Sequence, residues 1–168
     1  MKFLTVALLL CMALAAAAAD ECTFDQDHQV NVITSIAARF PGGSVNTGER
    51  QVTWESPAEG TTLFSYGGCY DLGSMITRST QLAAPRTEDQ IFELARELSV
   101  RFWSNEIVSE RRAAEALLAG LRASKYTTEE SNGKMFYSIS DPGYVELCIE
   151  HEYRDGIDHV VIAWQGNF

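Results

Sequence analysis

Residues 144–165, "YVELCIEHEYRDGIDHVVIAWQ", determine how the C-terminal strands pair. Two runs of alternating residues flank Asp155-Gly156, and an Asp-Gly pair in that position is a strong hairpin signal. A two-residue loop fixes the register of the two strands. It predicts three facing pairs: Glu152 with His159, Cys148 with Ala163, and Leu147 with Trp164. We therefore predict an antiparallel hairpin that has one apolar face.

Two further turn signals extend this hairpin to four antiparallel strands. Asn132-Gly133 predicts a second tight turn, and Asp141-Pro142-Gly143 predicts a three-residue loop. The expected strands are 125–131, 134–140, 144–154 and 157–165. Their shared apolar face, which we expect to form the core, comprises Tyr126, Met135, Tyr137, Ile139, Val145, Leu147, Ile149, Ile162 and Trp164.

The remaining chain predicts helices and a small β element. Thr87 followed by Gln90 forms a capping box before an apolar stripe, and Val108–Arg122 has a second helical pattern. Residues 25–40 fit a helix, although their β-branched residues also permit a strand, and residues 50–80 fit a small meander. The expected fold class is α+β. A four-stranded antiparallel C-terminal meander packs on two central helices, with an N-terminal helix and a small β element.

The first residues predict export. Lys2, an apolar run and the alanines up to Ala19 form a signal peptide over residues 1–19, followed by a single domain over residues 20–168. The apolar run is too short for a membrane span. The formal charge is −10, and loss of Lys2 with the signal leaves −11. This charge argues against nucleic acid and favours a partner with a basic surface.

Export also bears on the cysteines, because disulfides persist outside the cytoplasm. The mature chain keeps Cys22, Cys69 and Cys148, which is an odd number. One disulfide and one free or intermolecular thiol is the simplest count. We expect the disulfide to join Cys148 to Cys22 or Cys69, and it would pin another segment across the outer face of the sheet.

The outer face of the predicted sheet is the candidate binding surface. The predicted register places Cys148 and Phe136 at the centre of an apolar island and places glutamates around it. An apolar centre with a polar rim is typical of a protein interface. The candidate partner-binding residues are Glu129, Phe136, Glu146, Glu150, Glu152, His159 and Val161.

Catalytic and metal chemistry have weaker support in the sequence. The zinc motif HExxH, the nucleophile motif GxSxG, the Walker loop and the dinucleotide motif GxGxxG are all absent, so we expect no cofactor or metal. Glu150, Glu152 and His159 form an ion-pair group more readily than a metal site. A thiol enzyme would use Cys69 as nucleophile, beside Asp71 and one histidine. The available histidines are His28, His151 and His159.

We therefore expect an exported, non-enzymatic acidic binding protein, an inhibitor or immunity-type partner of a basic enzyme or toxin. Two alternatives remain. One is a small exported thiol-dependent hydrolase centred on Cys69. The other is a periplasmic carrier that holds a small ligand between the helices and the sheet. The sequence leaves the oligomeric state and the identity of the partner open.

Overall fold

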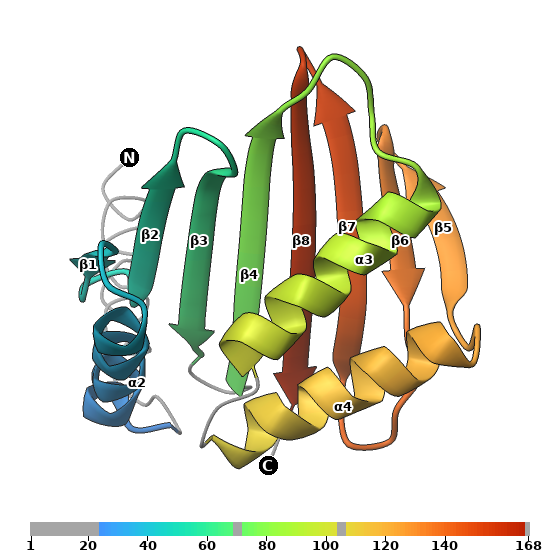
Figure 1. The fold of residues 1–168 in the computed structure, drawn as a ribbon. Helices are drawn as coiled ribbons and strands as arrows, with labels where there is room; N and C mark the ends of the chain where they lie inside the picture. Colours follow the sequence, from blue (N-terminus) through green and yellow to red (C-terminus); the bar gives the residue numbers. More distant parts are fainter. Residues whose placement is uncertain (1–23, 69–71, 104–106, 167–168) are drawn as a thin grey trace, which may run out of the picture.

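The computed structural model describes residues 24–68, 72–103 and 107–166. Along the chain, a helical segment is followed by four strands, and this order occurs twice (Figure 1). In order, the elements are α2 (Gln26–Arg39), β1 (Ser44–Asn46), β2 (Gln51–Ser56), β3 (Gly60–Gly67), β4 (Leu72–Gln81), α3 (Glu88–Leu98), the π-helical turn η1 (Ser99–Trp103), α4 (Val108–Arg122), β5 (Thr127–Ser131), β6 (Lys134–Ser138), β7 (Glu146–Arg154) and β8 (Ile157–Gly166).

All the strands in the described ranges belong to one antiparallel sheet in the order β1-β2-β3-β4-β8-β7-β6-β5. The expectation of a four-stranded C-terminal meander with a separate small β element is therefore wrong. The two halves join because β4 pairs with β8 along ten positions, from Leu72 opposite Gly166 to Gln81 opposite Ile157. The described residues therefore form one eight-stranded sheet with three α-helices, rather than the expected four-stranded sheet packed on two helices (Figure 1).

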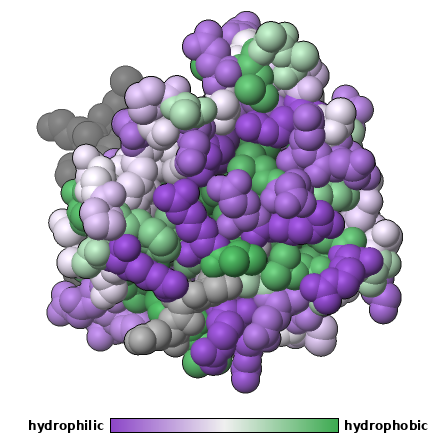
Figure 2. All heavy atoms as spheres, viewed as in Figure 1, coloured by the Kyte–Doolittle hydropathy of each residue, from purple (hydrophilic) through white to green (hydrophobic). Residues whose placement is uncertain are grey.

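The three helices lie on the same side of the sheet (Figure 1). α2 contacts β1, β2 and β3, whereas α3 and α4 lie over the other half. The core fills the space between the helices and this face, and Figure 2 shows that the outer surface of the helix side is mostly hydrophilic. The core includes Phe64, Ile76, Phe102, Trp103, Ile162 and Trp164, each at most 1 % exposed.

Local caps explain where two of the helices begin. The Asp25 side chain accepts hydrogen bonds from the backbone N–H groups of Asp27 and His28, which resolves residues 26–39 as a helix rather than a strand. Thr87 and Gln90 form the expected capping box at the start of α3. These short-range signals are reliable because they satisfy backbone donors that the helix itself leaves unpaired.

Two of the three predicted turns have different outcomes. The Asp155-Gly156 register is confirmed, since Glu152 faces His159 and Cys148 faces Ala163. The register predicted from the Asp141–Gly143 turn is wrong by two residues, because Ser138 and not Phe136 lies opposite Cys148.

The connection between β6 and β7 is longer than predicted because Tyr144 makes contacts outside the sheet. The Tyr144 hydroxyl donates to the backbone carbonyl of Ser109 at 2.8 Å, and its ring packs against Trp164 with centroids 5.8 Å apart. This contact draws Tyr144 out of the ladder and leaves Val145, an expected core residue, 71 % exposed. A slip of two residues keeps each of the other side chains on its predicted face.

Candidate functional site

The candidate site is the face of the sheet that points away from α2, α3 and α4, which we call the open face. Side chains on this face form rows across the strands, because paired residues point to the same side. One row runs through Glu129, Phe136, Glu150, Val161, Thr77 and Leu63, and a second runs through Lys134, Glu152, His159 and Ser79. Glu146 begins a third row. All seven predicted partner-binding residues therefore lie on the open face.

An apolar patch crosses the middle of the open face and comprises Leu63, Met75, Phe136, Cys148, Val161 and Ala163. Apart from Cys148, these side chains are half-buried although no described helix covers them. Sequence analysis missed Leu63 and Met75. The alternation of β3 and β4 assigns them to one face, but only the β4–β8 pairing brings that face beside Val161 and Ala163.

The acidic rim of the patch is partly neutralised. Lys134 Nζ lies 2.5 Å from Glu150 Oε1 and 3.7 Å from Glu152 Oε2, and Arg154 Nε lies 3.3 Å from Glu152 Oε1. The hydrogen bond to Glu150 is the main cause that raises the pKa of Lys134, so this lysine stays charged. Glu146 has no ion pair with any described residue, and its Oε1 accepts from Cys148 Sγ at 3.2 Å.

The two histidines of the sheet have structural partners. His159 Nδ1 lies 2.8 Å from Ser79 Oγ on the open face. His151 lies on the helix-covered face, where its Nε2 is 2.9 Å from Oδ1 of the fully buried Asp158, which also binds Arg86. Within the described ranges, no group of three or more His, Cys, Asp and Glu side chains could hold a metal ion.

Cys148 is a free thiol and is 7 % exposed. Burial is the largest cause that raises its pKa to about 12, and the neighbouring Glu146 adds to the effect. A thiol with this pKa stays protonated and is a poor nucleophile. Because Cys148 is a free thiol, its expected disulfide is not formed in the structure. Cys22, Cys69 and Asp71 lie outside the described residues, so a disulfide between the two cysteines or a thiol site at Cys69 stays a prediction.

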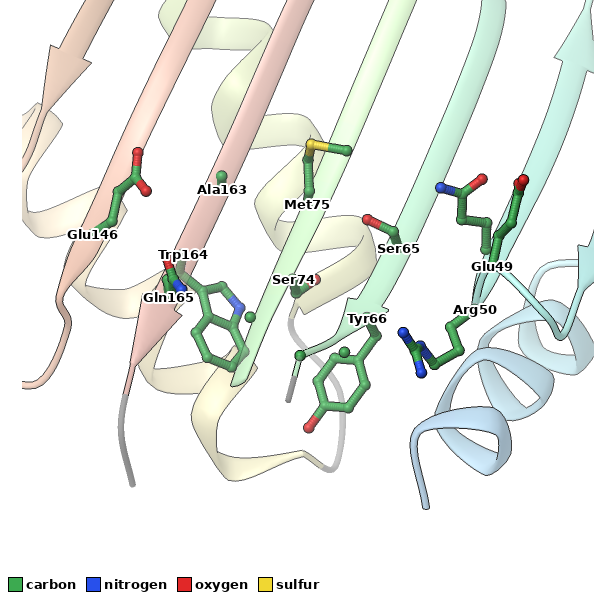
Figure 3. Close-up of a pocket in the computed structure, with 14 residues that line it drawn as sticks. Glu49, Arg50, Ser65, Tyr66, Ser74, Met75, Glu146, Ala163, Trp164 and Gln165 are labelled. Carbon is green, nitrogen blue, oxygen red and sulfur yellow. The ribbon is translucent and has the colours of Figure 1, made fainter. Parts of the chain in front are cut away.

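A hollow of about 390 Å³ lies at one end of the open face (Figure 3). Two glycines that face each other, Gly67 and Gly73, leave a gap in the row that continues through Gln165 and Glu146. Figure 3 shows Glu146 and Arg50 on opposite sides of the hollow.

Neighbouring atoms lie too close to Gly67 and Gly73 for either position to carry a side chain. A Cβ on Gly73 would come within 2.8 Å of the Trp164 carbonyl oxygen. A Cβ on Gly67 would lie 2.5 Å from Gln29 Oε1 and 3.0 Å from Arg50 Nε. The Arg50 side chain therefore extends beside Gly67, where Nη1 donates to Gln26 Oε1. The pairing of Gly67 with Gly73 across neighbouring strands is recognised only from the register.

The space expected to hold a small ligand is occupied. Phe64, Ile76, Phe102 and Trp103 fill the centre between the helices and the sheet, and Trp103 Nε1 donates to Ser74 Oγ at 3.1 Å. The carrier alternative therefore gains no support from these residues. In the part of the chain that the structure describes, no helix has the length and apolar character needed to span a membrane.

Comparisons of the chain with protein-family models, with curated proteins and with solved structures found no match.

Proposed function

We propose that the mature chain is an exported binding protein whose open face docks a partner protein with a basic surface. In this proposal it acts as an inhibitor or immunity-type partner of a basic enzyme or toxin. One observation carries the proposal. The apolar patch lies in the middle of a wide sheet face that no described helix covers, and glutamates border it. An apolar centre with a polar border is the usual anatomy of a protein interface.

The occupant proposed for this face is another protein rather than the chain's own N-terminus. If the signal is cleaved after Ala19, residues 20–23 precede the described part of the domain. Four residues span at most about 14 Å. Eight strands spaced about 4.8 Å apart span roughly 34 Å. These four residues are therefore too short to cover the open face.

Charge supports a basic partner. The mature chain has a formal charge of −11, and such a field attracts a basic protein and speeds its encounter. Of the three outward glutamates of β7, Glu150 and Glu152 already have cationic partners, whereas Glu146 has none among the described residues. We therefore expect charge to contribute mainly to association rate and orientation, and the apolar patch to contribute the affinity.

A pull-down with two matched variants tests the proposal. Tagged mature protein captures partners from secreted and cellular extracts at low and then high salt, and mass spectrometry identifies them. The open-face variant carries Glu146→Lys, Glu150→Lys and Glu152→Lys. The control carries the same change in net charge on exposed glutamates that are not on the open face, as Glu93→Lys, Glu115→Lys and Glu130→Lys.

The two variants separate a specific surface from overall charge. We expect a basic partner to bind the wild type and the control and to be lost from the open-face variant, because only that variant reverses the charge of the docking surface. Equal binding by all three proteins would show that the open face is not the docking surface. If both variants lost the partner equally, the interaction would depend on net charge alone.

A further inference from the structure

The hollow beside Gly67 and Gly73 opens onto the open face, so its chemistry bears on what the partner presents there. Four features define it: a floor without side chains, an apolar wall, a carboxylate at one side and a cation at the other (Figure 3). We infer that the hollow is an anchor site that takes one arginine or lysine side chain of the partner, with the cationic group beside Glu146. This inference rests on the proposed function.

Glu146 is the carboxylate best placed to bind a new cation. Its side chain is exposed, and its described contact is the weak thiol donor of Cys148 at 3.2 Å. In contrast, Lys134 binds both Glu150 and Glu152. A partner's cation at either of those positions would compete with an existing ion pair, whereas at Glu146 it would form a new one.

The walls suit the stem of a long basic side chain. Met75 and Ala163 face each other in neighbouring strands directly beside the Gly73–Gln165 step. They offer an apolar surface next to the carboxylate of Glu146 (Figure 3). Lysine and arginine bury their aliphatic stems along such surfaces and keep the charged group at a polar edge. The hollow, of about 390 Å³, leaves the room that the stem needs.

The opposite side of the hollow directs the cation toward Glu146. Arg50 lies beside Gly67 and is held there by Gln26, so its positive charge disfavours a second cation at that end. Glu49 also lines the hollow and is adjacent to Arg50 in the chain, so a cation that approached Glu49 would meet the positive charge of Arg50. The unbalanced charge of the hollow is therefore the carboxylate of Glu146.

The test is an NMR titration of ¹⁵N-labelled mature protein with N-acetyl-arginine methylamide. The matched probe N-acetyl-citrulline methylamide has nearly the same shape without the charge, and N-acetyl-glutamate methylamide tests for an anion site at Arg50. We expect saturable shifts at the amides of Gly73, Met75, Ala163 and Gln165 with the arginine probe. An exposed ion pair changes affinity by about two- to fivefold, so citrulline should bind more weakly by that factor.

Two variants localise the effect. Glu146→Gln should weaken the arginine probe by about two- to fivefold, and Glu55→Gln, an exposed glutamate of the same face that lies outside the hollow, should leave it unchanged. Equal binding of citrulline and arginine, stronger binding of the glutamate probe, no effect of Glu146→Gln, or the absence of saturable shifts would each overturn the inference. The docking proposal is judged separately by the pull-down, because the pull-down measures capture of a whole partner protein by the open face, whereas the NMR titration measures binding of a single side chain in the hollow.

Discussion

Cys148 shows how position on the sheet controls the chemistry of a side chain. It lies within the apolar patch and is buried although it points to the open face. Burial and the nearby carboxylates of Glu146 and Glu150 all disfavour the thiolate. Cys148 therefore acts as a small apolar residue at the centre of the patch.

The first prediction concerns the reactivity of this thiol. At pH 8 a thiol with a pKa of about 12 is ionised to about one part in ten thousand. We expect iodoacetamide to leave Cys148 unmodified in the native protein and to alkylate it fully in urea, as read by peptide mass spectrometry. Rapid native alkylation of Cys148 would contradict its assignment as a buried, inert residue.

The second prediction concerns stability at high pH. Burial is the largest cause that raises the pKa of Tyr66, Tyr144 and Cys148 to about 12. The unfolded chain loses the same protons near pH 9 to 10. The unfolded state therefore deprotonates first, so this stabilisation is fully present below about pH 9 and is lost as the pH rises toward 12.

Urea unfolding at pH 8 and at pH 10.5 measures the effect. We expect the free energy of unfolding to be lower at pH 10.5, and the Cys148→Ala variant to lose less of it than the wild type because one of the three groups is gone. A free energy that stays constant or rises over this range would show that these groups ionise as freely in the folded protein as in the unfolded chain.

The third prediction concerns the buried Asp158, which binds Arg86 and His151. Asp158→Asn keeps the shape but leaves the Arg86 guanidinium without its carboxylate. Since Arg86 keeps some contact with solvent, we expect a loss of about 2–4 kcal/mol in the free energy of unfolding. Asp155→Asn in the exposed turn is the control and should change it by less than about 0.5 kcal/mol. Similar effects of the two variants would show that the buried cluster adds nothing.

At the scale of elements, the decisive contact is the pairing of β4 with β8. These strands are far apart in the sequence, and each also reads as the last strand of a local meander. Local signals fix hairpins such as β7–β8, because the Asp-Gly turn sets the register within a few residues. No local sequence signal indicates which strand will pair with the edge strand of a meander. For this reason the fold class predicted from the sequence is wrong.

The fourth prediction follows from this junction. Because β4 and β8 share a ladder of ten pairs, we expect the two meanders to unfold together. Native-state hydrogen exchange should give the amides of Ile76 in β4 and Ile162 in β8 the same free energy of opening, close to that of global unfolding. A much lower value for Ile76 alone would mean that the N-terminal meander opens independently and that the junction is weak.

At the scale of the whole molecule, the placement of all three described α-helices on one side leaves the other side of the sheet open (Figure 1). The acidic rim of that side was predictable, because alternation and the Asp-Gly turn assign Glu146, Glu150 and Glu152 to one face. The extent of the apolar patch was not predictable, since Leu63 and Met75 join the patch only through the β4–β8 junction. The hollow was also not predictable, because it depends on two glycines that meet across β3 and β4.

Oxidative footprinting of the mature protein, with and without its captured partner, shows which face of the sheet the partner covers. Met75 and Met135 are the two methionines of the described residues, are both half-buried, and lie on opposite faces of the sheet. Docking on the open face should slow the peroxide oxidation of Met75 and leave the rate at Met135 unchanged. Protection of Met135 instead, or of neither methionine, would contradict the claim that the open face is the binding surface.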